Sequence, residues 1–247
     1  MRVRYLLLPL VLLTACQQKP ADPLPAIPQV EFATATITGR VFDGNDLSVE
    51  GVVVTVAETG ATYTTGADGL YVLQVPAQTT FTVRTWKYLY AGTTLTPLQL
   101  EADRVVTGLD ILVIPSSSIG AYNAQAGSDE ERGVLAIQVI SMSGRCDAAG
   151  ATVKVLNPET SQPMPGALAM YVKPGTSQPD RSVPMMQNGS RPNAWLVGVP
   201  EGQNFPVRFD KPGCTPLSFP VVYQKATYQP GLRIAARGLT QVPVFVE

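Results

Sequence analysis

The chain of 247 residues is 45% hydrophobic and 15% charged, with a net charge of -1, which is typical of a globular protein rather than a disordered one. It contains no histidine, the usual general base and the commonest zinc ligand, so most hydrolase and zinc-site functions are disfavoured. Because no basic excess exists to follow a phosphate backbone, nucleic acid is not expected as a partner.

Residues 1–15 have the layout of a secretory signal peptide. Arg2 and Arg4 precede an apolar run, 5–13, that is too short to span a bilayer. The run ends in the tetrapeptide LTAC, which resembles the bacterial lipobox, where a signal peptidase cleaves before the cysteine. The resemblance implies that Cys16 becomes the first mature residue and carries a diacylglycerol thioether and an N-acyl chain such as palmitate. An ordinary signal peptide with a chance cysteine at its end is the alternative.

The expected location follows from this lipid anchor. Several acyl chains, at about 0.8 kcal/mol per buried methylene, hold a protein stably on a membrane, whereas a single chain does not. Gln17 rather than an aspartate follows Cys16, which in lipoproteins of double-membrane bacteria favours the outer membrane. We therefore expect a lipid-anchored protein of the cell envelope that faces the periplasm or the surface, with the membrane as its first partner.

The sequence over 16–33 is rich in proline and is typical of a tether. Pro20, Pro23, Pro25 and Pro28 remove backbone donors and favour an extended, polyproline-like chain. At roughly 3.1 Å per residue, about fourteen such residues would hold a folded domain roughly 40 Å from the membrane.

Residues 34–115 alternate with a period of two and are rich in β-branched residues, which predicts an antiparallel β-sandwich. The expected strands are 35–42, 50–58, 61–65, 69–75, 79–88, 93–100 and 105–114. Residues 62–65 and 70–73 flank Asp68 and Gly69, which tolerate the positive φ of a tight turn, so a β-hairpin is expected there.

This region resembles the carboxypeptidase regulatory-like domain. The resemblance rests on Gly39–Asp43, Glu50–Val56 and Thr65–Tyr71, which are similar to the usual family patterns G-x-V-x-D, G-A-x-V-x-V and T-D-x-x-G-x-F/Y. It covers about residues 37–114 and implies a seven-stranded, transthyretin-like β-sandwich, a fold also grouped with carbohydrate-binding modules. The pattern residues are turn and core positions, so the resemblance implies a fold and no active site.

A boundary is expected at 116–132. Ser116, Ser117 and Ser118 begin this stretch, and the polar run 128–132 ends it. The acidic residues of that run would suit a short helix, but we favour a solvated linker.

A second copy of the sandwich is predicted over 133–247. Five residues reappear 124 positions later, namely Val75, Pro76, Phe81, Val83 and Arg84 as Val199, Pro200, Phe205, Val207 and Arg208. Upstream the offset is near 99, since Gly51, Val52, Val54 and Val56 correspond to Gly150, Ala151, Val153 and Val155. The change in offset predicts an inserted, proline-rich loop at about 157–194, with one possible strand at 167–173. The expected fold class is all-β, with two tandem antiparallel β-sandwiches.

Cys146 and Cys214 remain after the lipidated cysteine is set aside. An even pair in an exported protein favours a disulfide, and two unpaired thiols are the alternative. Closing a loop of about 68 residues would stabilise the fold by about 4 kcal/mol. Two cysteines without histidine cannot fill a tetrahedral shell, so no metal site is expected there.

Two further clusters have possible chemistry. Asp43, Asn45 and Asp46 carry oxygen ligands suited to calcium, but turn chemistry explains them more simply, and neither a metal nor another cofactor is expected. Trp86, Tyr88 and Tyr90 would project from one side of a strand, where aromatic rings stack on sugars or on a protein partner. Packing in the core or in a turn is the favoured interpretation for these three residues.

The sequence therefore predicts a non-enzymatic, membrane-anchored envelope lipoprotein that acts as a binding or structural module. It contains no paired carboxylates, Ser-Lys dyad or phosphate-binding loop that would indicate catalysis. Two alternatives are a carbohydrate-binding lipoprotein and a scaffold subunit of an envelope complex. The expected partner besides the membrane is an envelope protein or a polysaccharide.

Overall fold

The computed structural model describes residues 33–247 except 175, 177, 190 and 204, and the described residues belong to one compact unit. The predicted signal peptide, lipidated Cys16 and nearly all of the tether lie outside the described residues and stay predictions. Within the described chain, no helix is both long enough and apolar enough to cross a membrane.

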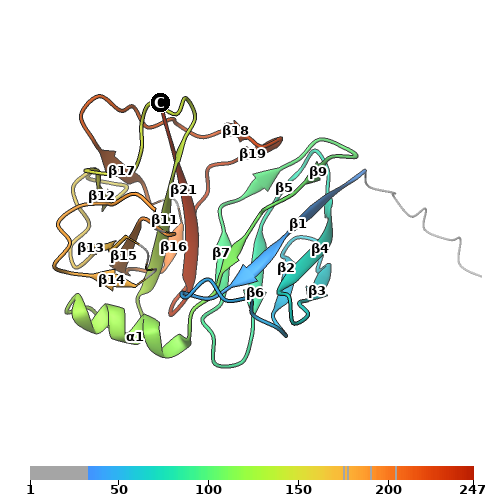
Figure 1. Cartoon of the computed structure of the whole chain (residues 1–247), viewed down its shortest axis with the longest axis horizontal. Coiled ribbons are helices and arrows are strands. Elements are labelled where there is room, and N and C mark those ends of the chain that lie inside the picture. Colours follow the sequence, from blue (N-terminus) through green and yellow to red (C-terminus); the bar gives the residue numbers. More distant parts are fainter. Residues whose placement is uncertain (1–32, 175, 177, 190, 204) are drawn as a thin grey trace, which may run out of the picture. The chain divides into compact units, whose positions relative to one another are not determined.

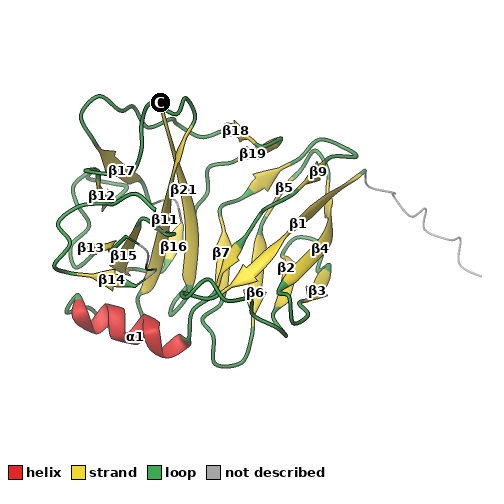
Figure 2. Cartoon of the chain, in the orientation of Figure 1, coloured by secondary structure: helices red, strands yellow, loops and turns green. Residues whose placement is uncertain are grey.

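The regular secondary structure of the described residues is almost wholly β-strand, which confirms the predicted all-β class (Figure 2). The first half contains β1 (Thr34–Phe42), β2 (Val53–Val56), β3 (Thr62–Thr64), β4 (Leu70–Pro76), β5 (Thr80–Phe81), β6 (Val83–Trp86), β7 (Thr93–Leu95), β8 (Leu98–Gln99), β9 (Val105–Val106) and β10 (Ile111–Leu112). The helix α1 (Ser116–Gln125) follows. The second half contains β11 (Gly133–Ser141), β12 (Thr152–Val155), β13 (Leu168–Val172), β14 (Pro179–Asp180), β15 (Ala194–Val199), β16 (Gly202–Gln203), β17 (Val207–Asp210), β18 (Val221–Tyr223), β19 (Ala226–Tyr228), β20 (Arg233–Ile234) and β21 (Leu239–Val246).

The first repeat is a two-layer sandwich around its own core. In one layer β1 pairs antiparallel with β4 and parallel with β9 and β10, and in the other β2 pairs with β3 and β6. Alternation along β1 buries Ala35, Ile37 and Val41, while Thr36 and Thr38 lie at the surface. The buried side chains of both layers meet in one hydrophobic cluster that includes Phe81.

The expected hairpin at 62–73 is wrong in its pairing, although its turn is placed correctly. β3 pairs with β2 and β4 pairs with β1, so this segment crosses from one layer to the other. Buried Thr65 explains the crossing, because its Oγ1 accepts the N–H of Val52 at 3.0 Å and donates to the carbonyl of Val49 at 2.7 Å. Gly69 adopts a φ of 69°, and a Cβ there would lie 2.6 Å from the Val41 carbonyl oxygen.

The second repeat reproduces the strand register of the first. The pair Thr55↔Arg84 between β2 and β6 corresponds to Lys154↔Arg208 between β12 and β17, and both pairings are antiparallel. Likewise β11 pairs antiparallel with β15 and parallel with β21, as β1 does with β4 and β10. The residue offsets seen in the sequence therefore correspond to equivalent positions in two related sheets.

The insertion at 157–194 is not simply a loop. The possible strand at 167–173 is confirmed as β13, which pairs with β15, and β14 extends the sheet beyond it. Met170 and Val172 are buried. The insertion therefore widens one sheet of the second repeat, because β15 offers an edge to which an apolar strand can pair.

Two strand ladders join the repeats (Figure 1). β21 pairs parallel with β7, which makes one sheet of nine strands in the order β14-β13-β15-β11-β21-β7-β6-β2-β3. The hairpin of β18 and β19 adds to β8 through Thr227↔Gln99 and Tyr228↔Leu98. Ala226 of this hairpin is buried in the core of the first repeat. The two repeats consequently share backbone hydrogen bonds and core, rather than only a connecting segment.

The solvated linker expected at 116–132 is wrong for its first part, where α1 lies. Ile119, Tyr122 and Asn123 are buried on one side of this helix, and the Tyr122 ring lies 5.4 Å from that of Trp195. Asn123 donates to the Arg132 carbonyl at 2.7 Å and accepts the N–H of Gly198 at 2.9 Å. The three serines at the start of α1 are more typical of a linker, so the sequence did not predict the helix. Contacts with the second repeat stabilise it.

Candidate functional site

The open face is the side of β2, β3 and β6 that is turned away from the first repeat's core, and its residues are half-buried or exposed: Val53, Thr55, Thr62, Thr64, Arg84 and Trp86. Strand register places Val53 between Trp86 and Thr64, and Thr55 between Arg84 and Thr62. The opposite sides of β2 and β6 are buried in the first repeat's core. Trp86 has 65% of its surface exposed, so the largest side chain of this face projects into solvent.

The three predicted aromatic residues do not lie on one side of a strand. β6 ends at Trp86, and a turn follows in which Leu89 adopts a φ of 67°. Tyr90 packs against the first repeat's core and under the ammonium of Lys87, 5.4 Å from the ring centroid. The favoured interpretation of turn packing therefore holds for Tyr90 but is wrong for Trp86 and for Tyr88, which is 75% exposed.

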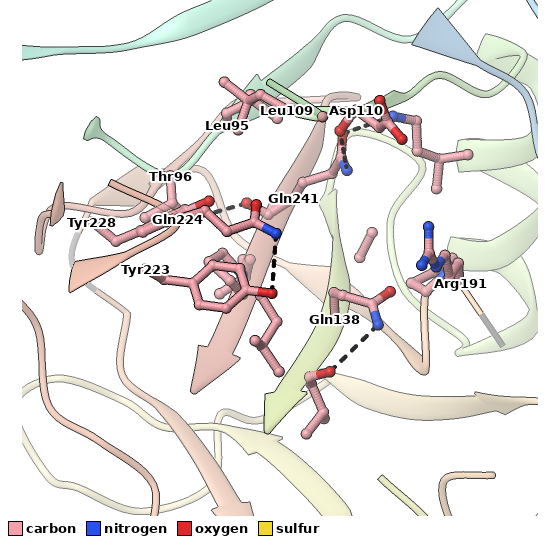
Figure 3. Close-up of a pocket in the computed structure, with 18 of the residues that line it drawn as sticks. Leu95, Thr96, Leu109, Asp110, Gln138, Arg191, Tyr223, Gln224, Tyr228 and Gln241 are labelled. Atoms are coloured by element: carbon pink, nitrogen blue, oxygen red, sulfur yellow. Dashed lines mark hydrogen bonds between the residues drawn. The ribbon is translucent and has the colours of Figure 1, made fainter. Parts of the chain in front are cut away.

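A cleft of about 420 Å³ lies where the two repeats meet (Figure 3). Tyr223 and Gln224 reach it from one side, and Gln138 and Arg191 from the other. A second hollow of about 860 Å³ adjoins it and shares Asp110, Gln138 and Arg191 among its lining residues.

The side-chain amides that line this cleft form hydrogen bonds with other groups of the protein. Gln241 accepts the N–H of Leu112 at 2.8 Å and donates to the Asp110 carbonyl at 3.5 Å, so one side chain bridges the repeats. Gln138 donates to the Asn193 side-chain oxygen at 3.1 Å. Since these groups already have partners, the cleft serves first as a joint between the repeats.

Two of the carboxylates that line the second hollow are held in ion pairs. Asp46 forms an ion pair with Arg40, and Asp147 forms one with Lys211. Hydrogen bonds from Lys211 and Asn188 lower the pKa of Asp147. A glycosidase requires the opposite, a carboxylic acid whose pKa is raised so that it can protonate a leaving group.

Tyr228 lies at the base of the cleft as a neutral group. Burial, with a smaller effect from Tyr223, raises the pKa of its phenol to about 12. Its ring centroid lies 5.0 Å from that of Phe245, so this tyrosine contributes packing rather than a base at neutral pH.

The predicted disulfide between Cys146 and Cys214 is present, with a Cα–Cα distance of 5.8 Å. Cys146 follows β11 and Cys214 follows β17, the strand equivalent to β6. The bridge therefore stands where the first repeat has its turn at 88–90. Asp147, the residue after Cys146, forms an ion pair with Lys211, which precedes Cys214 by three positions.

The turn at 43–46 is explained by its own hydrogen bonds. Asp43 Oδ1 accepts the backbone N–H of Asn45 at 2.8 Å and that of Leu47 at 3.0 Å. Across the residues that the structure describes, no group of three or more His, Cys, Asp or Glu side chains is arranged to hold a metal ion.

Sequence reasoning missed two features of these sites. Nothing near Gln241 in the sequence indicates that it joins the repeats, because its partners are more than a hundred positions away. The sequence did contain a signal that Trp86 is exposed. In the second repeat the equivalent position is occupied by Asp210, a residue type that usually lies at the surface.

No protein-family model and no curated protein matches the sequence. Among solved structures, a type II cohesin–X-dockerin complex from Acetivibrio cellulolyticus is similar at 14% identity and a TM-score of 0.29, over 46% of this chain and 81% of that chain. A streptococcal ancillary pilin is similar at 13% identity and a TM-score of 0.26, over 88% of this chain and 63% of that chain. A minor pilin of Streptococcus agalactiae is similar at 11% identity and a TM-score of 0.25, over 86% of this chain and 95% of that chain. No functional conclusion is drawn from similarities at this level.

Proposed function

We propose that this chain is a non-enzymatic lipoprotein of the bacterial cell envelope that binds carbohydrate on the open face. In this proposal Cys16 carries the lipid, residues 17–33 are the tether, and the repeats at 34–115 and 133–247 form the body. Both repeats are proposed as carboxypeptidase regulatory-like sandwiches joined through 116–132. The outer membrane is the proposed location, with the protein facing the periplasm or the surface.

The exposure of Trp86 is the observation that carries the proposal. Leaving an indole 65% exposed forgoes the stabilisation of burying it, about 25 cal/mol per Å² of apolar surface. A sugar ring has an apolar face that stacks on an indole, and its hydroxyl groups suit Thr55 and Thr64 of the same face. The strand pairing holds these residues in register, which reduces the entropy lost on binding.

A polysaccharide pull-down with the full-length, detergent-solubilised protein tests this proposal. We expect binding to at least one envelope or plant polysaccharide, and a loss of about tenfold or more in Trp86→Ala, since stacking contributes about 1–3 kcal/mol. Val222→Ala is the matched control, because Val222 is equally exposed at 65% on β18 of the other repeat. Binding that is equal in Trp86→Ala and the unchanged protein would contradict the proposal.

A scaffold function is the second candidate, favoured by one specific observation. Trp86, Tyr88 and Leu89 are close in sequence and are 65%, 75% and 67% exposed, and β3 is the terminal strand of the nine-stranded sheet. Exposed apolar groups and a sheet edge suit a protein partner. Affinity purification from detergent-solubilised membranes distinguishes the candidates, since only the scaffold requires a protein in constant proportion to this chain.

A further inference from the structure

Arg84 differs from its equivalent in the second repeat, because it forms no ion pair with an acidic side chain among the residues that the structure describes. Arg208 Nε donates to Asp210 at 2.7 Å, two residues along β17. The residue two positions beyond Arg84 on β6 is Trp86, so the carboxylate is replaced by an indole. Arg84 Nε is buried and has no hydrogen-bond partner among the described residues. A buried N–H of a charged group is costly to leave unsatisfied, which indicates that an acceptor from outside the chain fits there.

A second arginine reaches the same place from the other repeat. Two cavities of about 430 and 140 Å³ lie along the boundary between β6–β7 and β20, and Arg84, Thr94 and Arg233 line both of them. We call these two cavities the boundary groove. Neither arginine takes part in an ion pair within the described part of the chain. Two guanidinium groups from different repeats are thus available to one ligand.

The boundary groove also contains two carboxylates, which limit the charge of a ligand. Glu58 lines the smaller cavity and accepts the N–H of Thr82 at 2.7 Å, and Glu201 lines the larger one. With two arginines and two glutamates the lining is neutral, so a singly charged group suits it better than a phosphate that carries two charges. A carboxylate matches the planar, two-point geometry of a guanidinium.

The boundary groove continues toward the open face. Arg84 and Trp86 alternate along β6 and therefore point to the same side of the sheet. Thr85 and Gly92 also line the larger cavity, and the antiparallel register Arg84↔Thr94 of β6 and β7 sets Gly92, which has no side chain, opposite Trp86. A ring stacked on Trp86 can thus place a substituent beside Arg84.

We propose that the boundary groove binds the carboxylate of a uronic acid unit whose ring stacks on Trp86, so that the protein recognises an acidic polysaccharide. This inference rests on the proposed carbohydrate-binding function and assigns the class of sugar. Arg84 and Arg233 form hydrogen bonds with the carboxylate, and Thr94, which also lines both cavities, offers a hydroxyl group.

Calorimetry that measures the affinity for oligosaccharides of galacturonate, glucuronate and mannuronate tests the inference. Each oligosaccharide is compared with a form whose carboxyl groups have been reduced to alcohols. We expect at least one acidic form to bind about tenfold or more tightly than its reduced form, as for hydrogen bonds to charged groups. Arg84→Gln and Arg233→Gln should each remove most of this difference. Arg208→Gln, at the equivalent position of the second repeat, is the control and should preserve it.

The outcomes separate the two proposals. Equal affinity for the acidic and reduced forms, lost in Trp86→Ala, would overturn the uronate inference and support sugar binding. An acidic preference that survives Arg233→Gln and Arg84→Gln would place the carboxylate elsewhere and overturn it as well. Absence of binding to every form would overturn the inference. If Arg84→Gln does not fold, exposed Arg233 still decides the result, since its side chain is not part of either core.

Discussion

Gln241 of the second repeat accepts a hydrogen bond from the backbone N–H of Leu112 in the first, across 2.8 Å. The backbone carbonyl of Gln241 also accepts the hydroxyl of Thr96 at 3.1 Å. Side chain and main chain of one residue therefore both join the repeats at the point where β21 pairs with β7. This residue therefore adds two hydrogen bonds to the strand ladders that join the repeats.

The first prediction concerns this joint. Replacing Gln241 with alanine removes the acceptor of the Leu112 N–H, and we expect the free energy of unfolding to fall by about 1–3 kcal/mol. Thermal and denaturant unfolding measure the change. Gln125→Ala, at the exposed end of α1, is the control and should change stability by less than about 0.5 kcal/mol. An unchanged unfolding midpoint in Gln241→Ala would show that the joint does not depend on this amide.

The second prediction concerns the disulfide, which closes a chain segment with a sequence separation of 68. Removing it in a Cys146→Ser, Cys214→Ser double variant should lower stability by about 4 kcal/mol, because the unfolded chain regains loop entropy. Denaturant unfolding of the unchanged protein with and without a reductant gives the same comparison. Non-reducing mass spectrometry should recover both cysteines in one linked peptide, and free thiols at both positions would refute the bridge.

The third prediction is a pH dependence. The pKa of Asp147 in the folded state lies below its usual 3.8, because Lys211 and Asn188 donate hydrogen bonds to the carboxylate. A lowered folded-state pKa adds stability at pH values above the unfolded pKa and loses it as the pH falls through the folded value. The contribution should therefore be complete at pH 5 and above and disappear in strong acid. It is small, since the side chain is 56% exposed.

The test of this pH dependence is a comparison of variants. Unfolding midpoints of the unchanged protein and of Asp147→Asn, measured from about pH 6 to pH 2, should differ most at the upper end and converge in acid. Asp129→Asn is the control, because Asp129 is exposed and forms no ion pair in the described chain. Parallel curves for Asp147→Asn and the unchanged protein would contradict the prediction.

The fourth prediction concerns the anchor. Cys16→Ala should release the protein from membranes into the soluble fraction and abolish incorporation of labelled palmitate, because the thioether and the processing site are both lost. Cell fractionation and metabolic labelling measure the two effects. Gln17→Ala keeps the cysteine and should still be labelled. Labelling that continues in Cys16→Ala would show that the LTAC sequence is not a lipobox.

Much of the strand pattern was predictable because it depends on neighbouring residues. Alternation of apolar and polar residues placed β1 and β4 within a residue or two of their observed bounds. The offset that relates Arg84 to Arg208 correctly indicated equivalent strand positions. The cysteine pair followed from the even count that remained after Cys16.

The candidate site was predictable only in part. Trp86 was identified as an aromatic residue of interest, but its exposure depends on where β6 ends and on which side of the sheet is left uncovered. Arg233 was not identified, because it reaches the boundary groove only when β20 is placed beside the first repeat.

The sequence alone determined the all-β class, the repeat, the cysteine pair and the expectation of an anchor, since each depends on local pattern, composition or spacing. Tertiary structure decided how the repeats are joined. The apolar sides of Ile119 and Tyr122 stabilise α1 only because the second repeat covers them, and the strands of both repeats form one large sheet only because β21 lies beside β7. The same packing decided that Trp86 is exposed. Contacts between residues far apart in the chain therefore turn two similar sandwiches into one body that carries the open face in its first repeat.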